Sequence, residues 1–269
     1  MKTKVVLITG GSSGIGKAIG EYLQNKGFKV YGTTRTLEKH ADFNGFQLLK
    51  MDVTNIESIQ QAVDTILVKE GRIDVLINNA GIGITGPIEE TPHTEIVKVF
   101  DTNFHGQIHT IKAVLPQMRK QKAGLIINIT SIAGFMGLPY RGIYSATKGA
   151  MELITETLRM ETKDFGIHIT SIAPGDFTTN IAAGRYHAPI LEDSAYRIPY
   201  DKTLQLIDKG VNEGEDPVLM AQTVLKVINA KNPKVRYKVG SFMQKFSLRL
   251  KNVLPDKVYE KLLLNHYKL

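Results

Sequence analysis

The 269-residue sequence contains no cysteine. This excludes disulfide bonds, thiol nucleophiles and cysteine-ligated zinc sites, and it is typical of a reducing compartment, so we expect a cytoplasmic protein. No segment approaches the ~18 uninterrupted apolar residues of a transmembrane helix. The apolar run at residues 5–8 is too short for the core of a signal peptide. No histidine spacing indicates a metal site, and none is expected.

Positive charge is concentrated at the C-terminal end of the chain. The net charge is +8, and residues 231–269 hold ten Lys/Arg against two Asp/Glu. The remaining residues hold 24 of each sign, so the whole excess belongs to the last 39 residues. Such an asymmetry indicates a tail with its own partner. No nucleic-acid recognition motif accompanies the charge, so nucleic acid is not an expected partner.

Short apolar runs alternate with amphipathic segments along most of the chain. The predicted strands are residues 4–8, 28–32, 46–51, 72–77, 124–129, 167–172 and 236–239. The predicted helices between them include residues 17–26, 55–70, 94–118 and 142–162. This alternation predicts the α/β class, a doubly wound parallel sheet covered on both faces. Ligands bind at the carboxyl ends of the strands in such folds.

A glycine-rich turn, Thr-Gly-Gly-Ser-Ser-Gly-Ile-Gly at residues 9–16, stands between the first predicted strand and helix. Glycines let the backbone approach a pyrophosphate, and the helix N-terminus offers free N–H groups. The second strand ends in Arg35 where NAD sites usually carry an acid, so NADP(H) is favoured over NAD(H). Lys17 is a second candidate for the 2′-phosphate. The alternatives are a purely structural turn and an Arg35 that only caps the surface.

Tyr144 and Lys148 lie four residues apart on a predicted helix and therefore share one face. A free tyrosine has a pKa near ~10. An ammonium about 4 Å away stabilises a phenolate by ~4 kcal/mol at an effective dielectric of ~20. The pair can thus act as a proton donor to a carbonyl oxygen. Its spacing also occurs by chance on lysine-rich surface helices without chemistry.

Several short motifs occur together in a fixed order. They are residues 9–16, Asn-Asn-Ala-Gly at 78–81, Asn103, Ser131, Tyr144, Lys148 and Pro174-Gly175. In this combination residues 3–230 closely resemble the short-chain dehydrogenase/reductase family, in its single-domain branch. The resemblance implies a Rossmann-type fold with about seven strands, a nicotinamide cofactor, and hydride transfer to or from carbon. Homodimers or homotetramers formed through the helices of Asn103 and Tyr144 are also implied.

The resemblance further implies residue roles. Tyr144 would be the acid–base residue, Ser131 would bind the substrate oxygen, and Lys148 would bind the nicotinamide ribose and hold Tyr144 reactive. Asn103 would kink its helix and position a water linking Lys148 to solvent. The expected cofactor-binding residues are Gly10, Ser12, Ser13, Gly14, Ile15, Gly16, Arg35, Asp52, Val53, Asn79, Ala80, Gly81, Tyr144, Lys148, Pro174, Gly175, Phe177 and Thr179.

A substrate lid is expected at residues 180–215. Its apolar side chains favour a hydrophobic ketone or secondary alcohol of the steroid, retinoid or long-chain keto-lipid type, as do those near Ser131. These residues are Ile181, Tyr186, Ile190, Leu191, Tyr196, Ile198, Tyr200, Phe135, Met136, Leu138 and Tyr140. Alternatively they only pack against one another. The runner-up functions are a reductase of small polar ketones or aldehydes, and a cofactor-sensing binding protein.

The chain divides into a Rossmann-type domain at 1–240 and a basic amphipathic extension at 241–269. Two helices are predicted in the extension, at 241–252 and 256–267, separated by Pro255. In the first, Phe242, Phe246, Leu250 and Val253 share one face. Such a tail can pack over the substrate pocket, bind a partner protein, or make peripheral contact with an anionic membrane.

Overall fold

The computed structural model describes residues 3–178 and 184–269. Its centre is a seven-stranded parallel sheet with the order β3-β2-β1-β4-β6-β7-β9. The strands are β1 (Val5–Ile8), β2 (Lys29–Thr34), β3 (Gln47–Lys50), β4 (Val75–Asn78), β6 (Gly124–Ile129), β7 (Ile167–Pro174) and β9 (Arg236–Val239). The predicted doubly wound fold is confirmed. Its strand order reverses between β1 and β4, where this class of fold places its ligand crevice.

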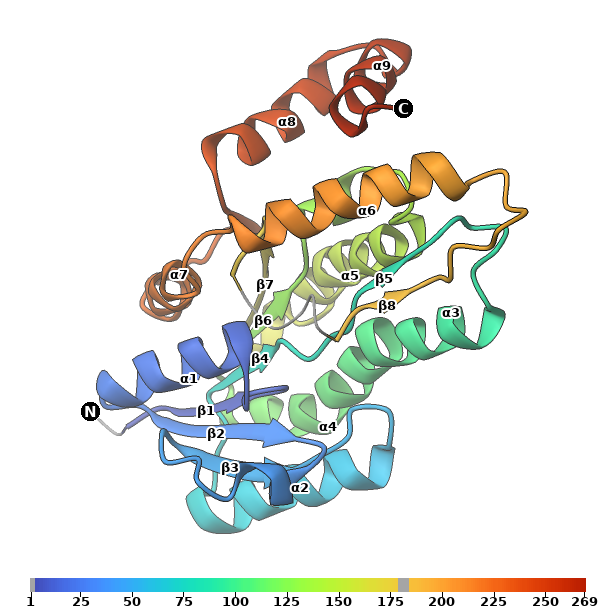
Figure 1. Cartoon of the computed structure of the whole chain (residues 1–269). Coiled ribbons are helices and arrows are strands. Elements are labelled where there is room, and N and C mark those ends of the chain that lie inside the picture. Colours follow the sequence, from blue (N-terminus) through green and yellow to red (C-terminus); the bar gives the residue numbers. More distant parts are fainter. Residues whose placement is uncertain (1–2, 179–183) are drawn as a thin grey trace.

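Both faces of the sheet are covered by helices, which explains the unbroken apolar strands (Figure 1). Helices α1 (Gly14–Asn25) and α7 (Val218–Ile228) pack on one face, with Val6 and Ile8 of β1. Helices α2 (Ile56–Glu70), α4 (Gly106–Gln121) and α5 (Gly142–Glu161) pack on the other, with Val5 and Leu7. The two cores hold the strand ends in fixed positions, and those ends carry the candidate site.

The helix predicted over residues 94–118 is not one regular helix. It consists of α3 (His93–Phe100), a π-helical turn η2 (Asp101–His105) and α4. The wider turn contains Asn103, whose buried side chain bonds backbone groups of Ile82 outside its own helix. A π turn of this kind frequently marks a functional position. The resemblance implied a distortion at Asn103, whereas apolar periodicity alone predicted continuity.

Residues 184–215 of the predicted lid form a short strand β8 (Tyr186–His187), which pairs in parallel with β5 (Ile84–Thr85), and the helix α6 (Arg197–Asn212). Tyr200 is buried and donates a hydrogen bond from its hydroxyl to the carbonyl oxygen of Thr85, at 2.9 Å. The remaining short elements are the 3-10 turns η1 (Leu37–His40), η3 (Ile132–Phe135) and η4 (Lys163–Phe165).

The C-terminal extension forms α8 (Phe242–Val253) and α9 (Asp256–Tyr267), close to the predicted bounds. The two helices lie outside the sheet layers, beside α6 (Figure 1). Leu248 of α8 and Tyr259 of α9 form a small core with Ile132 and Met136, so the extension packs over the segment that follows Ser131. None of the described helices is both long and apolar enough to cross a membrane.

Most of the face of α8 that the sequence pattern selected as apolar does not pack. Of its four residues only Leu250 packs against the small core, whereas Phe242 and Val253 are 72% and 80% exposed and Phe246 is also exposed. Met243, beside them, is 68% exposed. The packing side is instead the one that carries Leu248. Periodicity grouped these side chains on one face but could not identify which side of α8 the body of the protein covers.

Candidate active site

A cleft of about 420 Å³ opens at the carboxyl edge of the sheet. Most of the predicted cofactor residues line it, namely Gly10, Ser12, Ser13, Gly14, Ile15, Arg35, Asp52, Val53, Asn79, Ala80, Gly81, Tyr144, Lys148 and Pro174. Four do not. Gly16 packs beneath the turn, Gly175 and Phe177 line a neighbouring pocket, and Thr179 is outside the described residues.

Sequence reasoning missed other lining residues, which are Thr33, Thr34, Thr36, His40, Met51, Ile82, Thr102, Ile129, Thr130 and Gly184. Several of them stand at the carboxyl ends of predicted strands, and this position was the available signal. Lys17 does not line the cleft. Its ammonium lies 3.7 Å from Glu21 and over the ring of Phe43 instead.

The glycine turn forms a backbone cradle at the start of α1. Gly10 and Gly14 have φ values of +65° and +52°, which side-chain-bearing residues rarely adopt. A Cβ atom on Gly16 would lie 2.3 Å from the carbonyl oxygen of Gly10. The side chain of Ser13, the N-cap, accepts no capping hydrogen bond from the first turn of this described helix, so the N–H groups there stay available for an anion. This cradle fits the phosphates of a dinucleotide.

Asn79 and Thr9 hold the cradle in place. The amide nitrogen of the Asn79 side chain donates to the carbonyl oxygens of Thr9 and Gly10, both at 3.0 Å. In return, the Thr9 hydroxyl accepts from the backbone N–H groups of Asn79 and Ala80, at 3.0 and 2.9 Å. These bonds join β1 to β4 at the switch point, which explains why an asparagine and a threonine occupy these positions.

Lys148 is the buried cation of the site. Its side chain lies on α5 and only 4% of the residue is exposed. The ammonium donates to the carbonyl oxygen of Ile129 at 3.0 Å and lies 5.9 Å from the centroid of the Tyr144 ring. Burial lowers the pKa of Lys148, and the neighbouring Tyr144 and Glu152 oppose this shift.

Asn103 connects the π turn with α5, the helix of Tyr144 and Lys148. Its side chain accepts from the N–H of Ile82 at 2.8 Å and donates to the carbonyl oxygen of Ile82 at 2.9 Å. It also donates to the hydroxyl of Thr147 on α5, at 3.3 Å. A Cβ atom on Gly81 would lie 3.2 Å from the Asn103 oxygen and 3.4 Å from the Lys148 nitrogen. The three residues therefore converge on one point.

Ser131 and Tyr144 line a second, smaller pocket of about 60 Å³, next to the cleft. Ser131 is the N-cap of η3 and accepts from the N–H of Ala133 at 3.1 Å. The structure thus brings together the serine, the tyrosine and the lysine of the predicted catalytic set. A hydroxyl donor and a phenol that face one small cavity can both bind a single carbonyl oxygen.

Charged side chains also line this pocket, and sequence reasoning did not single them out. They are Arg141, Asp176 and Arg185. The Arg141 guanidinium lies 5.5 Å from the centroid of the Tyr144 ring. Arg185 is nearly buried and pairs with Asp208 at 3.4 Å; burial lowers its pKa, as does repulsion by Arg141. Arg141 and Arg185 belong to no sequence motif, so nothing in the sequence pattern indicated that they line this pocket.

The apolar residues that predicted the substrate class lie mostly elsewhere. Phe135, Met136 and Leu138 pack in the small core with α8 and α9. Ile190, Leu191 and Ile198 are exposed, and the rings of Tyr140 and Tyr200 pack on each other at 5.1 Å. Ile181 is outside the described residues. The apolar lining of the small pocket comes instead from Ile15, Ile84 and Phe177.

Metal-ligating side chains do not gather in the described part of the chain, where no group of three His, Cys, Asp or Glu residues could hold an ion. His105 lies 2.9 Å from a carboxylate oxygen of Asp101, within the π turn.

Comparison with known proteins gives consistent relatives. The family model described as short chain dehydrogenase matches residues 4–189. A 3-ketodihydrosphingosine reductase of Bacteroides thetaiotaomicron is 40% identical, over 97% of this chain and 96% of that protein. A short-chain dehydrogenase from Streptomyces avermitilis has a TM-score of 0.84 at 31% identity, covering 99% of this chain and 97% of that chain. The structure of ElxO with NADP bound has a TM-score of 0.70 at 29% identity, covering 88% and 97%.

Proposed function

Because the chain belongs to the short-chain dehydrogenase/reductase family, we propose that it is an NADP(H)-dependent oxidoreductase that interconverts a ketone and a secondary alcohol on a hydrophobic substrate. The observation that carries the proposal is the shared pocket of Ser131 and Tyr144, which adjoins a cleft lined by the glycine turn and Lys148. The pocket offers two hydroxyl groups to one oxygen, and the cleft offers a phosphate cradle.

Each catalytic side chain has one task in this mechanism. The Tyr144 hydroxyl gives its proton to the carbonyl oxygen during reduction and takes it back during oxidation. The Ser131 hydroxyl donates a hydrogen bond to the same oxygen and so stabilises its developing charge. The Lys148 ammonium stabilises the tyrosinate that remains, and Asn103 holds the backbone beside it. A bound nicotinamide supplies the hydride.

NADP(H) is the proposed cofactor. Arg35 lines the cleft where β2 ends, among the hydroxyl groups of Thr33, Thr34 and Thr36. A guanidinium with neighbouring hydroxyl donors suits a 2′-phosphate, and among the described lining residues those that β2 and its end supply, Thr33 to Thr36, include no acid to bind a ribose diol. Asp52 reaches the same cleft, and one of its carboxylate oxygens accepts from Thr54 at 2.9 Å.

A keto-lipid is the favoured substrate. The support is the 3-ketodihydrosphingosine reductase that is 40% identical along almost the full chain. The charged lining of the small pocket adds a refinement, because Arg141, Asp176 and Arg185 stand close to Tyr144. The substrate end that carries the ketone is therefore polar, whereas its body is apolar.

The same lining supports the runner-up, a reductase of small polar ketones or aldehydes. A cofactor-sensing binding protein is the alternative from another class. NADPH oxidation separates the three when it is followed with keto-lipids in micelles and with small ketones and aldehydes. Turnover of keto-lipids alone supports the main proposal. Preference for the small compounds supports the runner-up, and NADPH binding without turnover supports a sensor.

Self-association is proposed to use the exposed side of α5. Leu153 and Met160 are apolar and exposed on this helix, two turns apart, and Val97 is exposed on α3. Exposed apolar side chains on the helices of Tyr144 and Asn103 suit a dimer or tetramer interface. Light scattering tests this with Leu153→Asp, which should reduce the assembled mass, and with Val68→Asp on α2 as the control.

Peripheral membrane contact is proposed for the extension. The outward stripe of Phe242, Met243, Phe246 and Val253 is flanked by Lys245 and Arg249, on a tail that carries the whole net charge. Apolar side chains framed by cations are the features of a helix that lies on an anionic lipid surface. The cytoplasmic location expected from the lack of cysteine stays a prediction.

A further inference from the structure

A carboxylate that the catalytic mechanism does not use is buried next to Lys148. Glu152 follows Lys148 by four residues on α5, as Lys148 follows Tyr144, so the three side chains share one face of the helix. Glu152 is 3% exposed. Burying a carboxylate is costly unless it is paired and hydrogen-bonded, so its partners indicate what its presence achieves.

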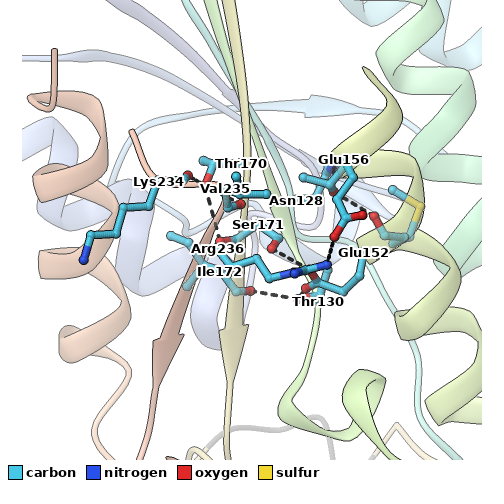
Figure 2. A network of polar contacts seen from close by, with 12 residues as sticks. Asn128, Thr130, Glu152, Glu156, Thr170, Ser171, Ile172, Lys234, Val235 and Arg236 are labelled. Carbon is cyan, nitrogen blue, oxygen red and sulfur yellow. Dashed lines mark hydrogen bonds and ion pairs between the residues drawn. The ribbon is translucent and has the colours of Figure 1, made fainter. Parts of the chain in front are cut away.

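The partners of Glu152 come from three strands (Figure 2). One carboxylate oxygen accepts from the hydroxyl of Thr130 at the end of β6, at 2.5 Å. The other accepts from the hydroxyl of Ser171 on β7 and from the guanidinium of Arg236 on β9, both at 2.8 Å. The bond to Thr130 lies at the carboxyl end of β6, beside the candidate site, whereas Ser171 is in the middle of β7 and Arg236 is the first residue of β9.

The bond to Thr130 matters because of the residues on either side. Ile129 precedes Thr130, and its carbonyl oxygen accepts from the Lys148 ammonium at 3.0 Å. Ser131 follows Thr130 and lines the small pocket with Tyr144. Lys148 and Glu152 on α5 therefore hold consecutive residues of one strand end, and the third residue in that row is the serine.

Glu152 also acts by its charge. Tyr144 and Glu152 are the titratable groups that oppose the lowered pKa of Lys148. Arg236 is the cation that faces Glu152, and it also pairs with Glu156, one turn further along α5. Thr130 and Ser171, from the strands packed against this side, are uncharged. Charges of alternating sign thus run from Lys148 through Glu152 to Arg236.

We propose that Glu152 is a positioning residue of the active site, which fixes Ser131 through Thr130 and serves as the counter-charge of Lys148. The inference rests on the proposed function for its effect on turnover. Its effect on the charge of Lys148 does not depend on any substrate. If Glu152 only linked α5 to β9, its replacement would change neither turnover nor the titration of Lys148.

Glu156 supplies a matched control. Both carboxylates pair with Arg236, but only Glu152 also bonds to Thr130 and lies one turn from Lys148. Glu152→Gln should lower kcat about tenfold or more with little change in the Kd of NADPH, because the misplaced group is on the substrate side. Glu156→Gln should leave kcat close to that of the wild type.

A titration of Lys148 tests the charge directly. Lysine side-chain carbons are labelled and followed by NMR from neutral to alkaline pH, and the signal absent in Lys148→Met identifies the residue. Removing an anion makes an ammonium lose its proton more readily, so Glu152→Gln should lower the midpoint by about 0.5–1 pH unit. Arg236→Gln should raise it, since the carboxylate then acts on Lys148 alone. Glu156→Gln should move it less than Glu152→Gln.

The turnover measurement and the titration of Lys148 test different claims. A wild type that reduces none of the ketones contradicts the proposed function, whereas the midpoints of Lys148 still report on Glu152. The role of Glu152 as counter-charge is contradicted if Lys148 titrates with the same midpoint in the wild type and in Glu152→Gln. It is also contradicted if Glu152→Gln and Arg236→Gln shift this midpoint in the same direction. If Glu152→Gln does not fold, the Lys148 midpoint in Arg236→Gln provides the test: a rise supports the counter-charge role, and a fall or no change contradicts it. Equal kcat in Glu152→Gln and Glu156→Gln overturns the positioning role.

Discussion

Gly134 and Gly149 pack with their backbones in contact. A Cβ atom on Gly134 would lie 3.0 Å from the nitrogen of Gly149, and one on Gly149 would lie 2.9 Å from the carbonyl oxygen of Gly134. Gly134 belongs to η3, which Ser131 caps, and Gly149 follows Lys148 on α5. This contact therefore sets the separation between the serine and the helix that carries the tyrosine and the lysine.

The contact predicts the effect of one methyl group. Gly149→Ala should push η3 away from α5, which costs about 1–3 kcal/mol of stability through overpacking and lowers kcat about tenfold or more by misplacing Ser131. Turnover and thermal unfolding measure the two effects. Gly137→Ala is the control, because a Cβ atom on Gly137 meets no atom of the described residues within 4 Å. If both variants behave alike, the spacing of η3 and α5 does not control the reaction.

Arg35 is predicted to select the cofactor. Arg35→Ala should weaken NADPH binding about 10–100-fold, the usual loss for charge-assisted hydrogen bonds, and leave NADH binding unchanged. Titration of both cofactors by fluorescence checks this. Lys17→Ala is the matched control, since Lys17 pairs with Glu21 and lies outside the cleft. Equal losses for NADH and NADPH would show that Arg35 does not read the 2′-phosphate.

The buried ammonium of Lys148 is predicted to destabilise the folded protein, although turnover requires it. Its pKa is lowered by burial, so at neutral pH the charged form is disfavoured in the folded protein relative to the unfolded chain. Lys148→Met should raise the free energy of unfolding by about 1–2 kcal/mol and abolish turnover. At pH values between the folded-state and unfolded-state pKa of Lys148, the unfolded chain binds more protons than the folded protein. The free energy of unfolding of the wild type therefore rises with pH in this range, and its difference from that of Lys148→Met becomes smaller.

Denaturant unfolding at several pH values tests this account of Lys148. The exposed Lys112 on α4 gives the control variant Lys112→Met, which should change little. A Lys148→Met variant less stable than the wild type at every pH would mean that the hydrogen bond to Ile129 outweighs the desolvation of the ammonium.

The exposed stripe on α8 predicts binding to anionic vesicles. Replacement of both Phe242 and Met243 by Ser should reduce vesicle affinity about tenfold or more, because each lost apolar contact is worth ~1 kcal/mol or more. Flotation with anionic and with neutral liposomes measures it, and Val68→Ser, an exposed apolar residue on α2, is the control. The idea fails if the wild type does not float with anionic liposomes at low salt.

The sequence allowed the sheet and most of the cleft to be predicted, because both depend on local patterns. Strands such as β1 and β4 are buried on both faces and appear as short apolar runs. Gly10 and Asn79 follow strand ends and Pro174 is the last residue of its strand, which is where the fold class places ligands. The confirmed family and fold follow from the order of these motifs.

What could not be predicted depends on partners distant in the sequence. The sequence left open whether Phe135, Met136 and Leu138 contact a substrate or only pack, since apolar character does not distinguish the two, and the structure packs them with α8 and α9. Arg141 and Arg185 join the small pocket from segments 44 residues apart, with no motif around either. The sequence also could not indicate which side of α8 faces outward, because this depends on packing against a distant segment of the chain.

The central claim is that Tyr144 transfers the proton between a ketone and its alcohol. Its direct test is the kcat of Tyr144→Phe in NADPH-dependent reduction of a keto-lipid, with NADPH binding measured on the same protein. We predict that kcat falls about 10²–10⁴-fold, the usual loss for a general acid, while the Kd of NADPH stays near that of the wild type. Turnover by Tyr144→Phe at the wild-type rate would contradict the assignment of the active site.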